Sequence, residues 1–313
     1  MEQLIPSKDK FENPNMKSLI SLIGPTAIGK TAMSIKLAKH FSSEIISADS
    51  RQFYREMKIG TAVPSDEELS LVPHHFIGHK SIFEKYSVGD FERDALEKIE
   101  LLFKKHERLF MVGGSGLYVD ALVKGLDKFP RVDPEIRENL TRRFAEDGLK
   151  PLQEELKKRD PVYYEKVDLE NPHRLIRALE ICIGTGKAFS GFLNQNKEKR
   201  NFRTLKIGLD APREIVYSRI ENRVDQMMED GLLEEAKKLW PHKKLNALNT
   251  VGYKELFQYL EGKIDLETAL SEIKKNTRRF AKRQMTWFRK DKAIVWFAYD
   301  SEKEIIDYIA NNT

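Results

Sequence analysis

The chain has 313 residues, of which 40% are hydrophobic and 33% are charged, and its formal net charge is +5. This length is enough for a sizeable core in one large or two modest domains. The single cysteine, Cys182, excludes an intrachain disulfide and a cysteine-based zinc site, and its apolar helical surroundings predict a buried side chain. We find neither a signal-peptide pattern nor an apolar run approaching about 18 residues, so we expect a cytoplasmic protein without a membrane segment.

The first third of the chain alternates between strand and helix patterns. Apolar runs at residues 17–24 and 44–48 predict buried strands, and the spacing of Met33, Leu37 and Phe41 predicts a helix between them. An amphipathic helix follows over residues 90–106, and a third strand lies at 109–112. Strands that alternate with helices favour a parallel sheet covered on both faces.

The alternation stops between residues 125 and 201, where helical patterns and polar turns occur without a convincing strand. A fourth strand at 203–209 then precedes a helix that Asp210 is expected to cap, with Pro212 in its first turn. The rest is mainly helical until a late strand at 293–298. We therefore predict an α/β core interrupted by a helical insertion.

A phosphate-binding motif joins the first strand to the first helix. Residues 24–31, GPTAIGKT, match G-x-x-x-x-G-K-[ST]. In such a loop the backbone N–H groups turn toward phosphate oxygens, the lysine adds positive charge, and the threonine hydroxyl suits Mg²⁺. We predict a P-loop NTPase-like core that binds a phosphate ester and Mg²⁺. Its binding residues are Gly24, Pro25, Thr26, Ala27, Ile28, Gly29, Lys30 and Thr31, with Thr31 as the Mg²⁺ ligand.

Kinases and nucleotide hydrolases with a P-loop usually carry an apolar strand that ends in an aspartate. Here the third strand ends in Gly113 and Gly114, and the second strand carries the acid, Asp49. A carboxylate at the carboxyl end of a parallel strand faces the ligand crevice, where it would be a metal ligand or a general base. A turn or cap role for Asp49 remains the alternative. Residues 50–61 mix amide, aromatic and basic groups, which suits either contact with a base or a solvated loop.

Two basic patterns follow. Arg219 and Arg223 are four residues apart on one helix face, so they could hold a diphosphate or belong to an ordinary surface helix. Residues 274–290 contain eight Lys or Arg and no acid, with aromatic residues interleaved. On a helix, Phe280, Gln284 and Trp287 or Phe288 run along one side, which predicts packing on the core beside charges that bind a phosphate backbone.

Three histidines, at positions 74, 75 and 79, lie close together in the sequence. Neither carboxylates nor cysteines accompany them at a metal-ligand spacing, so we predict loop or packing roles rather than a metal site.

Taken together, these residues resemble the bacterial tRNA dimethylallyltransferases, also called tRNA isopentenyltransferases. The resemblance runs from about Leu19 to Trp296, and the order and spacing of its motifs fit. The motifs are GPTAIGKT, SADSRQFYREMKIGTA, VGGSGLYVDAL, NPHRLIRALE, RIENRVDQMMEDGLLEE, VGYKE and TRRFAKRQMTWFR. It implies a catalytic core of residues 16–124 and 202–313 with C-terminal tRNA-binding helices, and an insertion domain of residues 125–201 that contacts tRNA.

The resemblance implies transfer of a dimethylallyl group from dimethylallyl diphosphate to N6 of adenosine 37, next to the anticodon of tRNA. The P-loop then holds the donor's diphosphate, with Arg223 and Arg219 neutralising the leaving group and Mg²⁺ bound at Thr31. Asp49 corresponds to the family's catalytic aspartate and would accept the N6 proton. Ser115 stands near the adenine where the family usually has threonine, and Val63 stands where relatives commonly have lysine.

The resemblance also assigns tRNA contacts along the chain, and we expect a monomer. These residues are Asp49, Ser50, Arg51, Gln52, Ser115, Arg137, His173, Arg174, Leu175, Ile176, Arg177, Asn249, Thr250, Val251, Gly252, Tyr253, Lys254, Lys282, Arg283, Gln284, Met285, Thr286, Trp287, Phe288 and Arg289.

Three other functions stay open at this point. A prenyltransferase acting on free adenine nucleotides would not need the helical insertion or the basic helix. A small-molecule P-loop kinase would turn over ATP and would not need the basic segment either. An RNA-binding module that senses nucleotides would leave Asp49 without a task.

Overall fold

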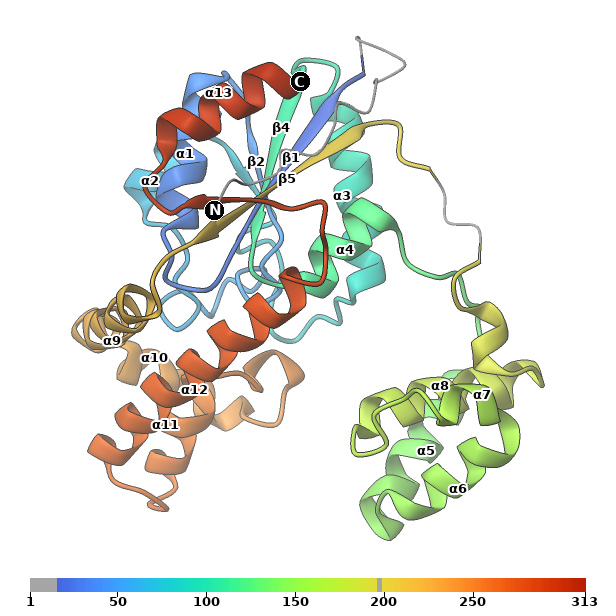
Figure 1. The fold of residues 1–313 in the computed structure, drawn as a ribbon. Helices are drawn as coiled ribbons and strands as arrows, with labels where there is room; N and C mark the ends of the chain where they lie inside the picture. The colour runs from blue at the N-terminus through green and yellow to red at the C-terminus, as the bar shows by residue number, and fades with distance from the viewer. Residues whose placement is uncertain (1–15, 196–198) are drawn as a thin grey trace. The chain divides into compact units, whose positions relative to one another are not determined.

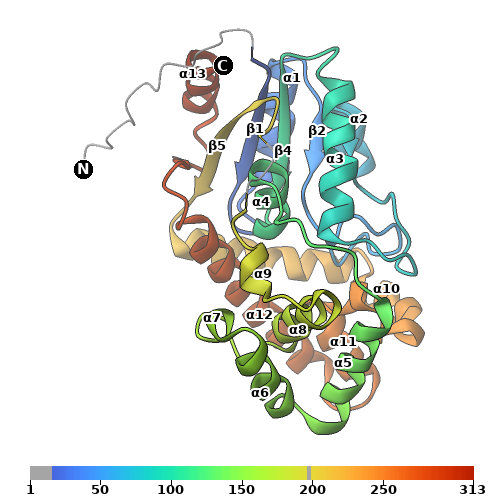
Figure 2. The ribbon, with the colours of Figure 1, turned by 90° about the vertical axis from the view of Figure 1, so that its right-hand side faces the viewer.

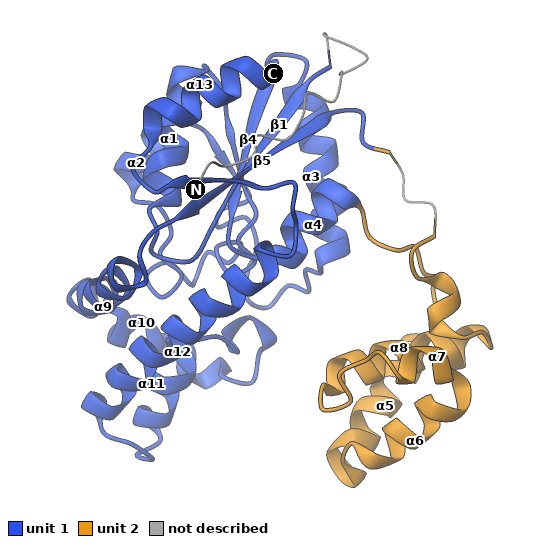
Figure 3. Cartoon of the chain, in the orientation of Figure 1, with its two compact units in different colours: residues 1–124, 200–313 blue, residues 125–199 orange. Residues whose placement is uncertain are grey.

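The computed structural model describes residues 16–195 and 199–313. Its contacts divide the chain into unit 1, which extends to residue 124 and resumes at 200, and unit 2, residues 125–199 (Figure 3). The insertion thus ends two residues before the predicted boundary, because the Arg200 guanidinium donates to the carbonyls of Ala121 and Leu122 and pairs with Glu92 in unit 1. None of the helices in the described ranges combines the length and apolar character that a membrane crossing requires.

Unit 1 is built on a six-stranded sheet in the order β3-β2-β4-β1-β5-β6 (Figure 1). Every pairing is parallel, which confirms the predicted α/β class. The strands are β1 Ser18–Ile23, β2 Ile45–Ser47, β3 His74–His75, β4 Arg108–Gly113, β5 Arg203–Asp210 and β6 Val295–Ala298.

Helices cover both faces of this sheet (Figure 2). All six residues of β1 are buried, as expected for a strand in the middle of a covered parallel sheet. Successive side chains point to opposite faces, so Leu19 and Ile23 pack in the cluster that contains α3 and α4 residues, whereas Ile20 and Leu22 pack with residues of α1 and α13. The two apolar clusters hold the sheet rigid beneath the loops at its carboxyl edge.

The helices of unit 1 fall into a group on the sheet and a group after β5. The first group is α1 Lys30–His40, α2 Asp66–Leu71, α3 Val88–Leu102, α4 Gly116–Lys124 and α13 Glu302–Asn312. The second is α9 Arg213–Glu229, α10 Leu232–Leu239, η2 Trp240–His242, η3 Asn246–Leu248, α11 Tyr253–Leu260 and α12 Leu266–Phe288. Local sequence sets their starts: at α3, Ser87 and Asp90 form a reciprocal capping box.

Unit 2 contains α5 Pro134–Asp147, α6 Lys150–Arg159, α7 Pro161–Tyr164, α8 Pro172–Thr185 and η1 Phe189–Phe192. As predicted, the described part of this segment holds no strand. Its own apolar core combines residues from α5, α6, α8 and η1, and Cys182 is buried within it, which confirms that prediction.

Some details differ from the sequence predictions. Asp210 is the last residue of β5 and does not cap α9, which begins at Arg213 with Pro212 in the capping position. The Asp210 carboxylate instead accepts from Ala211 N and forms an ion pair with Arg289. The elements β3, α2 and α13 are not among the predicted ones.

His75 and His79 are engaged within the protein, whereas His74 lines a cavity. His75 Nε2 lies 2.6 Å from a Glu44 oxygen. The His79 ring packs between Phe53, Phe76 and Tyr86, at centroid distances of 5.1–5.4 Å. Both nitrogens of His79 are buried without a partner, and burial, with Lys80 nearby, lowers the pKa of His79 to about 4.

This histidine predicts a pH-dependent part of stability. Because its folded pKa is lowered below the ordinary value of 6.5, the unfolded chain binds the proton first as pH falls. Above about pH 6.5, protonation of His79 therefore does not affect the free energy of unfolding. As pH falls from 6.5 to 4, it lowers the free energy of unfolding progressively. His79→Phe keeps a ring in the cluster, so the fall in urea midpoint from pH 7 to pH 5 should be smaller than in the wild type. An equal fall in both proteins would contradict the assignment.

Candidate active site

The carboxyl ends of β1, β2 and β4 converge on one site. Leu22, Ser47 and Val112 lie side by side across the three strands, so the loops that follow leave the sheet at one level. These loops are the P-loop, the turn carrying Asp49, and the Gly113–Gly114–Ser115 turn. A Cβ at Gly113 would come within 2.7 Å of the Ala48 backbone, so this close approach needs a glycine. The ligand crevice predicted from the sequence lies here.

The P-loop is shaped for an anion. Gly24, Ala27 and Gly29 have φ angles of 152°, 64° and 101°, and no side chain caps the start of α1. Its first N–H groups and the positive end of its dipole therefore remain for a ligand. A Cβ at Gly24 would meet the Leu209 carbonyl at 2.8 Å, so the turn is also packed too tightly for a side chain.

Lys30 lies at the centre of this loop. Its ammonium donates to the carbonyls of Gly24, at 3.1 Å, and Pro25, at 2.8 Å. Burial and the nearby charge of Arg223 together lower the pKa of Lys30 to about 7, although Asp49 opposes the shift. A bound diphosphate would compensate two buried positive charges at once.

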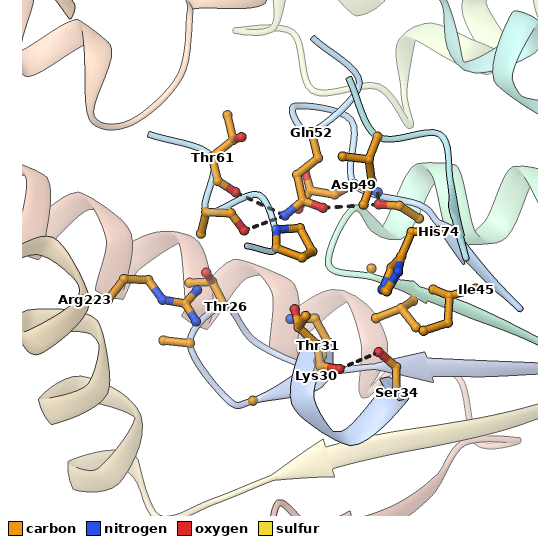
Figure 4. Close-up of a pocket in the computed structure, with 18 residues that line it drawn as sticks. Thr26, Lys30, Thr31, Ser34, Ile45, Asp49, Gln52, Thr61, His74 and Arg223 are labelled. Carbon is orange, nitrogen blue, oxygen red and sulfur yellow. Dashed lines mark hydrogen bonds between the residues drawn. The ribbon is translucent and has the colours of Figure 1, made fainter. Parts of the chain in front are cut away.

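The two arginines of α9 have different surroundings. The Arg223 guanidinium lies in the cavity beside Lys30 and makes no hydrogen bond with any described residue (Figure 4). Burial lowers the pKa of Arg223, with Arg219 as a further cause. Arg219 donates to the Ile28 carbonyl at 2.9 Å and stacks over Tyr299. Arg223 is therefore available to a ligand, whereas Arg219 stabilises the P-loop through its hydrogen bond to Ile28.

Asp49 faces the P-loop across a cavity that both line (Figure 4). One of its carboxylate oxygens accepts from Arg51 N at 2.9 Å, which fixes the side chain and leaves the second oxygen for a ligand. Ser115 Oγ lies 3.2 Å from both Ser50 N and Ser50 Oγ, so its hydroxyl stands beside the Asp49 turn.

A second, larger cavity continues from the first. The two share Thr26, Asp49, Thr61, Ala62 and Arg223. The larger one runs past the start of α4 and along α9, α11 and α12. Asp49 therefore stands where a small phosphate pocket opens into a long groove.

The basic helix α12 presents less free charge than its sequence suggests. Lys274, Lys275, Arg278 and Arg289 pair with Asp225, Glu272, Glu221 and Asp210. For the other four cations, no ion pair forms with a described residue. These are Arg279, Lys282, Arg283 and Lys290, which line a shallow pocket with Thr286 and Trp287.

The apolar side of α12 also differs from the prediction. Its buried positions are Ala269, Ile273, Ala281, Gln284 and Phe288, whereas Phe280 and Trp287 are 38% and 41% exposed. Residues 273, 281, 284 and 288 follow the three-to-four spacing of one face, and 280 and 287 lie on the neighbouring one. Phe280 and Trp287 line the large groove, and Trp287 Nε1 donates to Asp120.

For several of the predicted tRNA contacts, the side chain is buried or hydrogen-bonded within the protein. Leu175, Ile176 and Phe288 pack in apolar cores, and Tyr253 is fully buried. Both ends of the Gln284 amide form hydrogen bonds within the protein. Its oxygen accepts from Thr26 N, and its nitrogen donates to the Gly114 carbonyl. Arg51 donates to the carbonyls of residues 246, 247 and 249.

Gln284 thus joins the P-loop to the turn after β4, a role not predicted from the sequence. The sequence signal for this role is a polar residue, Gln284, among the apolar residues of one face of α12.

Other predicted contact residues remain accessible. Asn249 and Lys254 are exposed, Thr250 and Val251 are half-buried, and these with Gly252 line the groove. Lys282, Arg283, Thr286 and Arg289 are exposed, and Met285 is half-buried. In unit 2, His173 and Arg174 are exposed, and the guanidinium groups of Arg137 and Arg177 each lie 3.0 Å from the buried Glu180 carboxylate. Gln52 bonds Ser47 Oγ and the carbonyls of Thr61 and Ala62.

The pocket has groups that suit Mg²⁺ next to a diphosphate. Within the described residues, no three His, Cys, Asp or Glu side chains gather as a ready-made metal site. Mg²⁺ commonly keeps several waters and completes its shell with substrate phosphates. The Thr31 hydroxyl lines the cavity, as does His74, whose Nδ1 donates to the Val72 carbonyl. His74 Nε2 is then a buried acceptor without a partner, which suits a hydrogen bond from a metal-bound water.

Comparison with known proteins agrees with this geometry. Residues 52–291 match the family model described as IPP transferase. The tRNA dimethylallyltransferase of Christiangramia forsetii is 64% identical over 292 residues, covering 93% of this chain and 97% of the relative. That of Flavobacterium johnsoniae is 56% identical, covering 95% of this chain and 98% of the relative.

Solved structures give the same result. The tRNA isopentenylpyrophosphate transferase of Bacillus halodurans superimposes with a TM-score of 0.71 at 38% identity, over 94% of this chain and 96% of that one. A eukaryotic dimethylallyltransferase, crystallised while acting on tRNA, superimposes with a TM-score of 0.80 at 28% identity, over 95% of this chain and 80% of that one. The chain therefore belongs to the IPP transferase family, together with the tRNA dimethylallyltransferases that it matches along almost its whole length.

Proposed function

We propose that this chain transfers a dimethylallyl group from dimethylallyl diphosphate to N6 of adenosine 37 in tRNA, forming N6-isopentenyladenosine and diphosphate. One observation carries the proposal: Lys30 and Arg223 lie in a small cavity, and Asp49 stands where that cavity opens into a groove lined by α12. At this junction a diphosphate in the cavity and a nucleobase in the groove would both reach Asp49. The named relatives act on tRNA, which supports the same acceptor.

The donor's diphosphate would lie on the P-loop. Lys30 and Arg223 are partly dehydrated cations, so they interact with a phosphate anion more strongly than exposed side chains would. As N6 attacks C1 of the dimethylallyl group, the C1–O bond breaks and negative charge grows on the departing diphosphate. These fixed cations stabilise that charge without reorganising. Mg²⁺, held by Thr31 with waters facing His74, would supply further charge neutralisation on the diphosphate oxygens.

Asp49 would remove the proton that N6 must lose. An exocyclic amine is a weak nucleophile, and transfer of its proton during attack lowers the barrier. Arg51 N holds one carboxylate oxygen, so the other can face the amine. Ser115 and Ser50 would position the base beside it. The adenosine must leave its stack to enter this crevice.

The tRNA would lie along the groove of unit 1, with unit 2 making further contacts through Arg137, His173, Arg174 and Arg177. The exposed Trp287 and Phe280 offer surfaces for stacking, beside the unpaired cations of α12. We also propose, in keeping with the expectation from the sequence, that the enzyme works in the cytoplasm as a monomer.

A release assay tests the donor side. Diphosphate should appear from dimethylallyl diphosphate only when Mg²⁺ and an anticodon stem-loop are both present, and ATP should not be hydrolysed. ATP turnover without RNA would return the protein to the kinase or hydrolase class.

The charges of α12 predict a salt dependence. Lys282→Ala and Arg283→Ala each remove a cation without an ion pair to a described residue, so each should weaken stem-loop binding. The slope of log affinity against log salt should flatten by about 0.7–0.9 per lost phosphate contact. Lys275→Ala is the matched control, because this lysine on the same helix pairs with Glu272. A wild-type slope in Lys282→Ala and Arg283→Ala would place the RNA elsewhere.

A further inference from the structure

Glu235, on α10, accepts three hydrogen bonds from a loop beside the donor pocket and a fourth from Tyr253, on α11. Its Oε2 accepts from Lys58 N at 3.0 Å and Ile59 N at 2.9 Å. Its Oε1 accepts from Gly60 N at 2.9 Å and from the Tyr253 hydroxyl at 2.6 Å. Three consecutive backbone N–H groups that point to one spot form an anion-binding concavity, and a side chain from another element occupies it.

The chemistry of this contact requires a carboxylate. All four partners are donors, and an ionised carboxylate is the side chain that offers two oxygens and no hydrogen. The Tyr253 side chain is buried, and burial, with the neighbouring Glu235 charge, raises the pKa of its hydroxyl, so it remains a donor. A Cβ at position 60 would lie 2.6 Å from the Tyr253 ring, so Gly60 lets the loop close onto it.

The same loop forms a wall of the donor pocket. Thr61 and Ala62 line both cavities. Figure 4 shows Thr61 across the pocket from Lys30 and Thr31. Their carbonyls accept from Gln52 Nε2, at 3.2 and 2.9 Å, and Gln52 also bonds Ser47 Oγ. The chain of contacts therefore runs from α10 through the loop to Ser47 at the end of β2, two residues before Asp49.

We infer that Glu235 is a positioning residue for prenyl transfer: it holds residues 58–62 so that the wall of the donor pocket is already in place before the donor binds. This inference rests on the proposed function. A wall held in advance does not have to be ordered by the donor, so its loss raises the donor's KM. Tyr253 belongs to the groove-lining stretch 249–254, so this carboxylate also ties the donor pocket to the groove.

Glu235→Gln is the sharpest variant. Whichever way the amide turns, its NH₂ faces two donors, either Lys58 N and Ile59 N or Gly60 N and the Tyr253 hydroxyl. We expect the KM for dimethylallyl diphosphate and the Kd for inorganic diphosphate to rise about tenfold, equivalent to 1.4 kcal/mol. The KM for the stem-loop should change less than threefold, and hydrogen exchange at residues 58–60 should accelerate.

Two further variants make the test decisive. Glu234→Gln changes the adjacent side chain, which is 65% exposed and pairs with Lys237, and it should behave as the wild type. Tyr253→Phe removes one of the four hydrogen bonds to Glu235 and should raise the donor KM by a smaller factor. This variant still tests the inference if Glu235→Gln does not fold. A folded Glu235→Gln with faster exchange at 58–60 but an unchanged donor KM and diphosphate Kd would overturn the inference. A wild type that neither binds diphosphate nor transfers the prenyl group would instead overturn the proposed function.

Discussion

Asp49→Asn is expected to slow prenyl transfer by about 10²–10⁴-fold, the range that a positioned general base contributes. Asparagine keeps the shape of the side chain and can still accept from Arg51 N, as the Asp49 carboxylate does at 2.9 Å. It cannot take the N6 proton. The loss should therefore appear in kcat, measured by single-turnover transfer to a stem-loop, with the Kd of the RNA within about threefold of wild type.

Asp66→Asn is the matched control for that change, because it makes the same substitution at an exposed carboxylate that lines neither cavity. Asp49→Asn with a wild-type kcat would remove Asp49 as the base. A large fall in RNA affinity at unchanged kcat would assign Asp49 to nucleotide binding instead.

Arg223→Met should lower kcat/KM for the donor by about 10²–10³-fold, the scale for loss of one fixed group that stabilises developing charge. The Arg223 guanidinium lines the cavity beside the P-loop without a hydrogen bond to any described residue, so its charge is available to a ligand. Methionine retains most of the side-chain volume and removes only the cation. The measurement is steady-state kinetics in dimethylallyl diphosphate at saturating stem-loop.

Arg219→Met separates the two arginines of α9. Arg219 donates to the Ile28 carbonyl and stacks on Tyr299, so its loss should weaken support of the P-loop and reduce kcat/KM less than tenfold. Equal losses in both variants would contradict the distinction that the structure draws between them.

The sheet and the P-loop could be predicted from sequence because local patterns determine both. Strands such as β1 are short apolar runs, and the phosphate loop needs glycine at defined turns, so both leave a local signal. The two residues of β3 form an edge strand too short for a periodic signal. In α13, the buried residues Ile305 and Ile309 are four positions apart, so the sequence does carry a periodic signal for this helix.

The site was predictable to the extent that its residues belong to those motifs. The split between Arg223 and Arg219 was not, because it depends on which guanidinium meets the Ile28 carbonyl after folding. Nor was the Glu235 contact, since it joins α10 to N–H groups about 175 residues earlier in the chain, and backbone donors leave no mark in a sequence. The charge of α12 was overestimated, because its acidic partners lie on other elements.

The central claim is tested most directly by a transfer assay with radiolabelled dimethylallyl diphosphate, Mg²⁺ and two anticodon stem-loops that differ only at position 37. The account predicts that label enters the loop with adenosine there, at N6, and does not enter the loop with guanosine. Label in both loops, or in neither while ATP is hydrolysed, would contradict it.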